Sequence, residues 1–352
     1  MQRTGVALAM WMAFLAFNKA NGGFLCVHVA VHRGEPLTLL FVELIRLLGR
    51  GAMSKIPGKM TRKQHWIPRF YLKGFSDSSG RLHVFRRESV SFFKSDSEGI
   101  CASRDLYEVP YSDEIQSSDK YYSQNLIERR LSEMESRLAK AFDGLIKSCE
   151  SGLLNEGVGE EGRLAICFLA ANLIVRHPAL LGEERSKAAD YASSFEDEGF
   201  LTFKELEMLE WSGWCGDRTA VSELAIMSAH LLSNDKRVPQ NRIYNSFADK
   251  NLCIMEAPVG SSFIATSFPL FVVGSDGSLD SYEFDYAFIP LCSRYGASFT
   301  NDDRGFYRNL NHEELLTQNV LLLSNCPNWD IAFGCGRGPL TKAIEQWRLN
   351  SL

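Results

Sequence analysis

Residues 63–75 read KQHWIPRFYLKGF, a histidine and a proline set among aromatic and basic side chains. The cluster SDSSG (76–80) follows, and then RLHVFRR (81–87), in which Leu82 and Val84 alternate with other side chains, and ESVSFFKS (88–95). Aromatic and β-branched residues on both sides of a Ser/Asp/Gly loop are typical of a β-hairpin. We therefore predict strand, turn and strand from residue 69 onward. We expect ICASRDLYEVP (100–110) to run back across this hairpin until Pro110 ends it.

The middle of the chain changes to a helical period. Within residues 118–149, apolar side chains recur every three or four positions, at Ile127, Leu131, Met134, Leu138, Ala141 and Leu145. That stripe predicts one long amphipathic helix. RLAICFLAANLIVRHPALL (163–181) is apolar almost all round up to Arg176, which predicts a helix at the centre of a bundle that ends or kinks at His177-Pro178. We expect further helices near 202–212 and 218–233.

After Pro239 the pattern returns to short strands. NLCIMEAP, SSFIATSF, LFVVG, FDYAFIPL and YGASFT are separated by turns rich in glycine and aspartate. A helix is predicted at 311–325, where an Asn-x-x-Glu capping box opens the segment, and WDIAFG is predicted to be the last strand. Strands, then helices, then strands indicate an α+β fold. We predict an N-terminal β-hairpin and a C-terminal, mostly antiparallel sheet around a central helical bundle.

The charge of the chain is unevenly distributed. The 352 residues carry a net charge of −5, so the whole molecule does not attract nucleic acid electrostatically. Residues 54–94, however, contain ten Lys and Arg against only Asp77 and Glu88, a local charge of +8. Two interpretations stay open. One is a nucleic-acid surface on which bases stack, and the other is a solvated hairpin face with its aromatic rings turned inward. The rings in question are Trp66, Phe70, Tyr71, Phe85 and Phe92.

The cysteines and the N-terminus bear on localisation. The nine cysteines form no Cys-x-x-Cys pair and have no histidine at zinc-ligand spacing, so we expect free thiols, a reducing cytoplasm and no metal site. The apolar run 6–17 is shorter than a bilayer span, so no stable membrane span is expected. It also fits a weak signal or anchor. Residues 1–59 therefore form an extension that is signal-like, disordered, a helical appendage or not natural protein, and Met1, Met53 or Met60 is the start.

Four blocks of sequence carry a resemblance to a known family. The first holds His65, Pro68, Phe70, Tyr71, Leu72 and Phe75; the next hold Ala102, Asp105 and Tyr107, then Arg176 and Pro178, then FIATSFP at 263–269. Together they resemble the domain of unknown function 4238 family over residues 60–335. The resemblance implies one α+β domain at 60–340 with a tail or helix end at 341–352. It implies no activity, because the function of that family is unassigned.

The chain departs from the family pattern in its last block. Where the family usually shows Ser-Asp-Asn-Pro, this chain has Thr266-Ser267-Phe268-Pro269, without the aspartate. If that carboxylate were catalytic or a metal ligand, this chain would be impaired at that point.

The candidate site residues follow from chemistry and from these blocks. His65 could act as an acid or base near neutral pH. Arg176, at the end of an apolar helix, needs a carboxylate such as Asp105 or Glu135, or else an anionic ligand. The full set is His65, Tyr107 and Asp105 as catalytic residues and Gln64, Arg69, Tyr71 and Arg176 as ligand-binding residues.

Two functions stay open on this basis. The first is a site for an anionic ligand, a nucleotide or nucleic acid, with metal-independent hydrolase activity that uses His65 and no cofactor. The second is a non-catalytic binding or scaffold module in which the same residues form a buried polar network. Protein partners cannot be inferred from the sequence.

Overall fold

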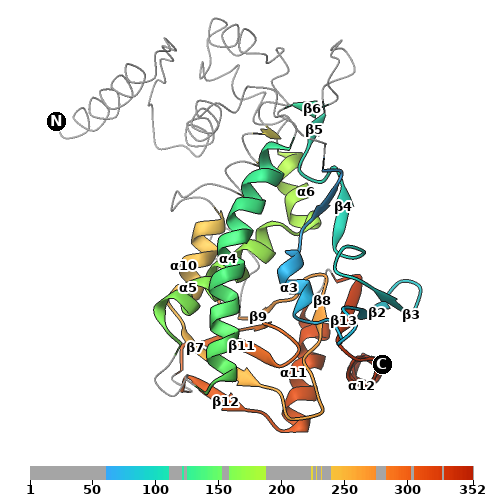
Figure 1. The fold of residues 1–352 in the computed structure, drawn as a ribbon, viewed down its shortest axis with the longest axis vertical. Helices are drawn as coiled ribbons and strands as arrows, with labels where there is room; N and C mark the ends of the chain where they lie inside the picture. Colours follow the sequence, from blue (N-terminus) through green and yellow to red (C-terminus); the bar gives the residue numbers. More distant parts are fainter. Residues whose placement is uncertain are drawn as a thin grey trace, which may run out of the picture.

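The computed structural model describes residues 61–110, 121–122, 125–152, 158–187, 223–224, 227, 231, 239–274, 283–302, 305–326 and 329–351. The predicted extension at 1–59 and the helix at 202–212 lie outside the described residues. The helix predicted at 218–233 does so too, apart from four isolated positions. The fold is α+β, as the order of sequence patterns predicted (Figure 1).

The opening motif forms a strand and a short helix. Strand β1 (Lys63–His65) is followed by helix α3 (Arg69–Lys73), so the strand predicted from residue 69 is wrong. The buried residues of this stretch, Ile67, Tyr71, Leu72 and Phe75, recur at helical spacing. Pro68 is the N-cap, and its fixed φ suits the entry to a helix. The period of four, not the β-forming character of the aromatics, decides this segment.

The predicted hairpin exists one element later along the chain. Strands β2 (Leu82–Arg86) and β3 (Ser91–Ser95) pair antiparallel. The segment 100–110 does not cross this hairpin, contrary to prediction. Its strand β4 (Ala102–Arg104) pairs with β1, and β5 (Val109–Pro110) pairs with β6 (Tyr121–Tyr122). The partner of β4 is therefore the opening motif itself.

The two ends of the described chain meet in one sheet. The hairpin joins β13 (Ile331–Gly334) and β8 (Ala265–Thr266) in a four-stranded sheet of order β3-β2-β13-β8. Helix α12 (Arg337–Asn350) lies against β13 and β2. The predicted boundary between residues 340 and 341 falls inside this helix.

The other C-terminal strands form a second, mostly antiparallel sheet of order β12-β7-β11-β10-β9. Its members are β7 (Asn251–Glu256), β9 (Phe271–Val273), β10 (Tyr286–Pro290), β11 (Tyr295–Thr300) and β12 (Tyr307–Asn309). Only β12 runs parallel to its neighbour, β7. Helix α11 (His312–Asn325) opens on the predicted capping box, with Asn311 and Glu314 in reciprocal hydrogen bonds.

The helices that follow the N-terminal strands and precede the C-terminal strands along the chain form the predicted bundle. Its members are α4 (Leu126–Glu150), α5 (Glu160–Val175), α6 (Pro178–Ser186) and α10 (Pro239–Ala248). Helix α5 packs between α4 and α10, and nearly all of its second half is buried. The chain bends by 60° between α5 and α6, at His177-Pro178. Within the described residues no single helix has the length and apolarity of a membrane span, although the bent pair α5–α6 taken together meets both criteria.

Candidate functional site

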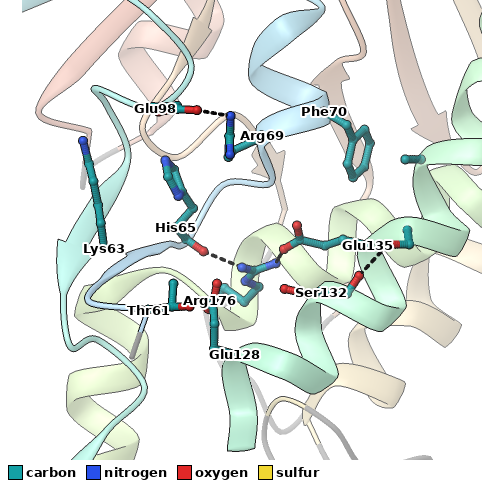
Figure 2. Close-up of a pocket in the computed structure, with 12 residues that line it drawn as sticks. Thr61, Lys63, His65, Arg69, Phe70, Glu98, Glu128, Ser132, Glu135 and Arg176 are labelled. Carbon is teal, nitrogen blue, oxygen red and sulfur yellow. Dashed lines mark hydrogen bonds and ion pairs between the residues drawn. The ribbon is translucent and has the colours of Figure 1, made fainter. Parts of the chain in front are cut away.

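A cavity of about 470 Å³ lies where the opening motif meets the helical bundle. Its walls come from β1, the start of α3, one face of α4 and the end of α5 (Figure 2). The lining residues are Thr61, Lys63, His65, Arg69, Phe70, Glu98, Glu128, Ser132, Glu135, Ser136, Ala139 and Arg176. Seven of these twelve side chains are titratable, an unusual density that makes the cavity the first place to look for chemistry.

His65 is the last residue of β1, and its ring is partly buried in the cavity wall. Its Nε2 atom is buried and has no hydrogen-bond partner among the described residues. Burial lowers the pKa of the imidazole, and the nearby cations Arg69 and Lys63 lower it further. At neutral pH the ring is therefore uncharged, and one of its nitrogens can accept a proton.

Arg176 holds the backbone of His65 in place. It is the C-cap of α5 and is only 1% exposed. Its guanidinium donates to Glu135 (2.5 Å), to the Tyr107 hydroxyl (3.0 Å) and to the carbonyl oxygen of His65. The Tyr107 hydroxyl donates to the same carbonyl at 3.0 Å. Of the two carboxylates predicted to meet Arg176, Glu135 does so and Asp105 does not.

These partners also fix the charge of Arg176. Burial alone would lower the pKa of the guanidinium, but the neighbouring Tyr107 and Glu135 outweigh burial and hold it above its ordinary value. Arg176 is thus a permanent cation with most of its donors already engaged. Its direct role is to orient the His65 segment, and Tyr107 shares that role.

Glu128 is the site residue that the sequence reasoning missed. Its Oε2 atom is buried without a hydrogen-bond partner among the described residues. Burial raises the pKa of this carboxyl to about 7, and the charge of Glu135 contributes to the rise although Arg176 opposes it. A signal was present in the sequence. Glu128, Ser132 and Glu135 recur at helical spacing one position after the apolar stripe of α4, so they share one face of that helix.

The mouth of the cavity carries two exposed cations. Arg69 forms an ion pair with Glu98, also exposed. Lys63 is exposed and makes no ion pair with the described part of the chain. In Figure 2 the His65 ring points toward Arg69 and Glu98, whereas Glu128 lies on the side of Thr61 and Arg176. The two unpartnered titratable groups thus stand on different sides of the same cavity.

Four of the seven predicted site residues lie elsewhere. Gln64 is buried between the Glu108 carboxylate (2.8 Å) and the Tyr107 backbone N–H (2.7 Å). Asp105 accepts from the Tyr121 hydroxyl at 2.7 Å, and Tyr71 donates to the Pro290 carbonyl at 2.5 Å. Tyr107 does not line the cavity, but its hydroxyl accepts from Arg176, which does. These side chains stabilise the fold around the cavity, and only His65, Arg69 and Arg176 line it.

A carboxylate does lie beside the departure from the family pattern. The Ser267 hydroxyl donates to Asp330, and the Asp330 backbone N–H donates back to it at 3.0 Å. The Ser267 carbonyl accepts from the Trp66 indole at 3.0 Å, which ties the last sequence block to the opening motif. The block therefore has a structural role in this chain.

The described residues contain no group of three or more His, Cys, Asp or Glu side chains placed to hold a metal ion. Seven cysteines in this part of the chain are free thiols, and six of them are buried.

Comparison with known proteins places the chain in a family without giving it an activity. The family model described as a protein of unknown function (DUF4238) matches residues 63–329, most of the chain. No curated protein and no solved structure matches the chain. The match begins at the first residue of β1, includes the five-stranded sheet and the helices that line the cavity, and ends just before β13. The chain therefore belongs to the DUF4238 family.

Proposed function

We propose that the cavity is an acid–base site that hydrolyses a small anionic substrate, with His65 as the general base and Glu128 as the general acid. The observation that carries this proposal is the opposite shift of two unpartnered groups in one cavity. Burial lowers the pKa of His65 and raises that of Glu128 to about 7. Groups with strongly perturbed pKa values cluster at functional sites, and a carboxyl whose pKa is raised by burial can serve as a general acid near neutral pH.

The protonation states suit such a reaction near neutral pH. His65 is neutral, and its imidazole can take a proton from an attacking water molecule. Up to a pH of about 7, Glu128 retains the proton that it would donate to the leaving group. The water is then divided between the two products, and one proton passes from Glu128 to the leaving oxygen while another passes to His65. Proton exchange with solvent restores both groups.

The charges at the mouth support an anionic substrate. Lys63 has no carboxylate partner among the described residues, and Arg69 is held only by the exposed Glu98. A phosphate or carboxylate group of the substrate can pair with Lys63 and compete with Glu98 for Arg69. Neutral His65 and protonated Glu128 carry no negative charge that would repel the anionic substrate. A mononucleotide or a similar phosphate ester has the required charge and fits the cavity volume.

The competing function is the scaffold module. The bonds of Gln64, Tyr107 and Arg176 favour it for those three residues, since they form a buried polar network. They do not explain the unpartnered atoms of His65 and Glu128, because burying such groups without a partner is costly. Unfavourable groups of this kind are commonly retained where function needs them.

Hydrolysis of anionic phenyl esters tests the proposal. Purified full-length chain is assayed with phenyl phosphate, diphenyl phosphate and a phenyl ester that carries a carboxylate, because the basic phenolate leaving group needs the proton of the general acid. His65→Gln and Glu128→Gln should each reduce turnover at least about 100-fold, the usual contribution of a general acid or base. Glu133→Gln is the matched control, because Glu133 is an exposed carboxylate of α4 that does not line the cavity.

Stability measurements on the same variants separate the two functions. A catalytic His65 predicts that His65→Gln changes the free energy of unfolding by less than about 1 kcal/mol. A His65 side chain that is hydrogen-bonded in a structural network predicts a loss of about 1–3 kcal/mol, because the substitution would leave a buried partner unpaired. Wild-type turnover equal to that of a His65→Gln/Glu128→Gln double variant would refute the hydrolase.

A further inference from the structure

A row of aromatic rings runs along the seam between α12 and the four-stranded sheet. Phe92 of β3 lies 5.0 Å from Phe85 of β2, measured between ring centroids. Phe85 lies 6.4 Å from Trp329, and Trp329 lies 5.2 Å from Trp347 of α12. The four rings therefore form a continuous series that joins three elements.

Three arginines lie over successive rings of this series. The guanidinium carbon of Arg337 is 5.1 Å from the centroid of Phe92, and that of Arg348 is 5.4 Å from Phe85. Arg87 lies over both tryptophans, at 5.1 and 5.3 Å. Cation–π contact orders these side chains without using their N–H donors. We call Arg87, Arg337 and Arg348 the arginine row.

The side-chain donors of the arginine row have no partner among the residues that the structure describes. All three side chains are exposed, and none makes a side-chain hydrogen bond or an ion pair with the described part of the chain. Glu88, which follows Arg87 in sequence, and Asp330, which follows Trp329, do not pair with them either; Asp330 accepts from Ser267 instead. Three planar, pre-oriented cations thus face solvent along one series of rings, within a protein whose net charge is −5.

This arrangement changes the interpretation of the basic segment. The stacking surface considered from the sequence would have offered bases the rings of Phe85 and Phe92, among others. Arginines of the same chain already lie over those two rings, and two of the three come from α12, far outside residues 54–94. What the surface offers a ligand is guanidinium N–H groups rather than aromatic faces.

We propose that the arginine row binds the phosphate backbone of a single-stranded nucleic acid. The guanidinium fork matches phosphate oxygens in a bidentate geometry. Successive phosphates of a single strand lie along one flexible line, so several of them can reach a row of cations. An extended acidic peptide suits the row less well, because its successive side chains point to opposite sides of the backbone.

The arginine row lies on elements that do not line the cavity, so this proposal does not depend on the proposed hydrolysis. The cavity is lined from β1, α3, α4 and the end of α5, whereas the row comes from the end of the β2 strand and from α12. A failure of either proposal leaves the other in place.

Fluorescence anisotropy with labelled oligo-dT and oligo-U on the full-length chain tests the row. Three phosphate contacts predict a slope of about −2 for log affinity against log salt, which is a loss on the order of 20-fold between about 50 and 200 mM salt. The triple variant R87Q/R337Q/R348Q should lose at least about 10-fold in affinity at the lower salt and most of that slope.

Arg86→Gln is the matched control. Arg86 is an exposed arginine that also lies over a ring, Phe93 at 5.3 Å, but successive side chains of a strand point to opposite faces. The Arg86→Gln variant should bind the oligonucleotides with the affinity of wild type. The triple Lys variant keeps the charge and should keep the salt slope while losing affinity, which also controls for misfolding of the Gln variant. No binding by wild type, an equal loss in Arg86→Gln, or tighter binding of a polyglutamate peptide than of either oligonucleotide would overturn the proposal.

Discussion

Replacing Glu128 by glutamine should become more favourable to the stability of the protein as pH rises. The folded state raises the pKa of this carboxyl from 4.5 to about 7, chiefly because burial penalises the charged form. Between those two values the folded state binds more protons than the unfolded state does. The free energy of unfolding of wild type therefore falls as pH rises through this window, and the whole cost is present above pH 7.

The size of the effect follows from the shift. Each pKa unit corresponds to about 1.4 kcal/mol, so the carboxylate of Glu128 costs about 3 kcal/mol at high pH. Glutamine keeps the shape but cannot ionise. It introduces an amide whose unpaired N–H groups cost a free energy that does not change with pH. The difference between the effects of the substitution at high and low pH is therefore more informative than either value alone.

Urea denaturation at about pH 4.5 and pH 8 measures this difference. The free energy gained through Glu128→Gln should be about 3 kcal/mol larger at pH 8 than at pH 4.5. Glu133→Gln, an exposed substitution on the same helix, should show no such gain. A Glu128→Gln effect that is the same at both pH values would show that the carboxyl is not held in its protonated form, and would remove the general acid from the proposed site.

The remaining predictions concern the groups around the cavity and the C-terminal helix. Arg176→Met leaves the Glu135 carboxylate without its donor and removes one of the two donors to the His65 carbonyl, so it should cost about 3–5 kcal/mol in urea denaturation; a loss below about 1 kcal/mol would contradict the network. Tyr107→Phe removes one hydroxyl that serves both Arg176 and His65, and should cost about 1–3 kcal/mol by the same assay. Asn311→Ala breaks the capping box of α11 and should cost about 1 kcal/mol, whereas Asn311→Asp should retain most of it; equal losses in both variants would argue against the cap.

Periodicity in the sequence predicted α4 and α5 well because each helix has the same surroundings along its whole length. Helix α4 buries one apolar stripe, and α5 is apolar almost all round, so the spacing of apolar side chains indicates both that the segment is a helix and where it lies. The α3 segment was misassigned because aromatic content was weighed above its four-residue period, which the buried Tyr71 and Phe75 display.

Long-range pairing was beyond the sequence patterns. Strand β13 joins the N-terminal hairpin through the register Phe333 to Val84, a partnership of segments about 250 residues apart that no local pattern specifies. The same limit applies to the candidate site. His65 and Arg176 were found from their chemistry, but Glu128 falls off the apolar stripe and was not selected, because only the folded chain places it in a shared cavity.

The pH dependence of kcat/KM for a phenyl ester that the wild type hydrolyses, whose basic leaving group needs a proton, tests the central claim most directly. The profile should be bell-shaped, with an alkaline limb near the Glu128 pKa of about 7 and an acidic limb below the ordinary His pKa of 6.5. The residual activity of Glu128→Gln should lack the alkaline limb, and that of His65→Gln should lack the acidic limb. A profile that keeps both limbs in both variants would contradict the assignment of acid and base to this cavity.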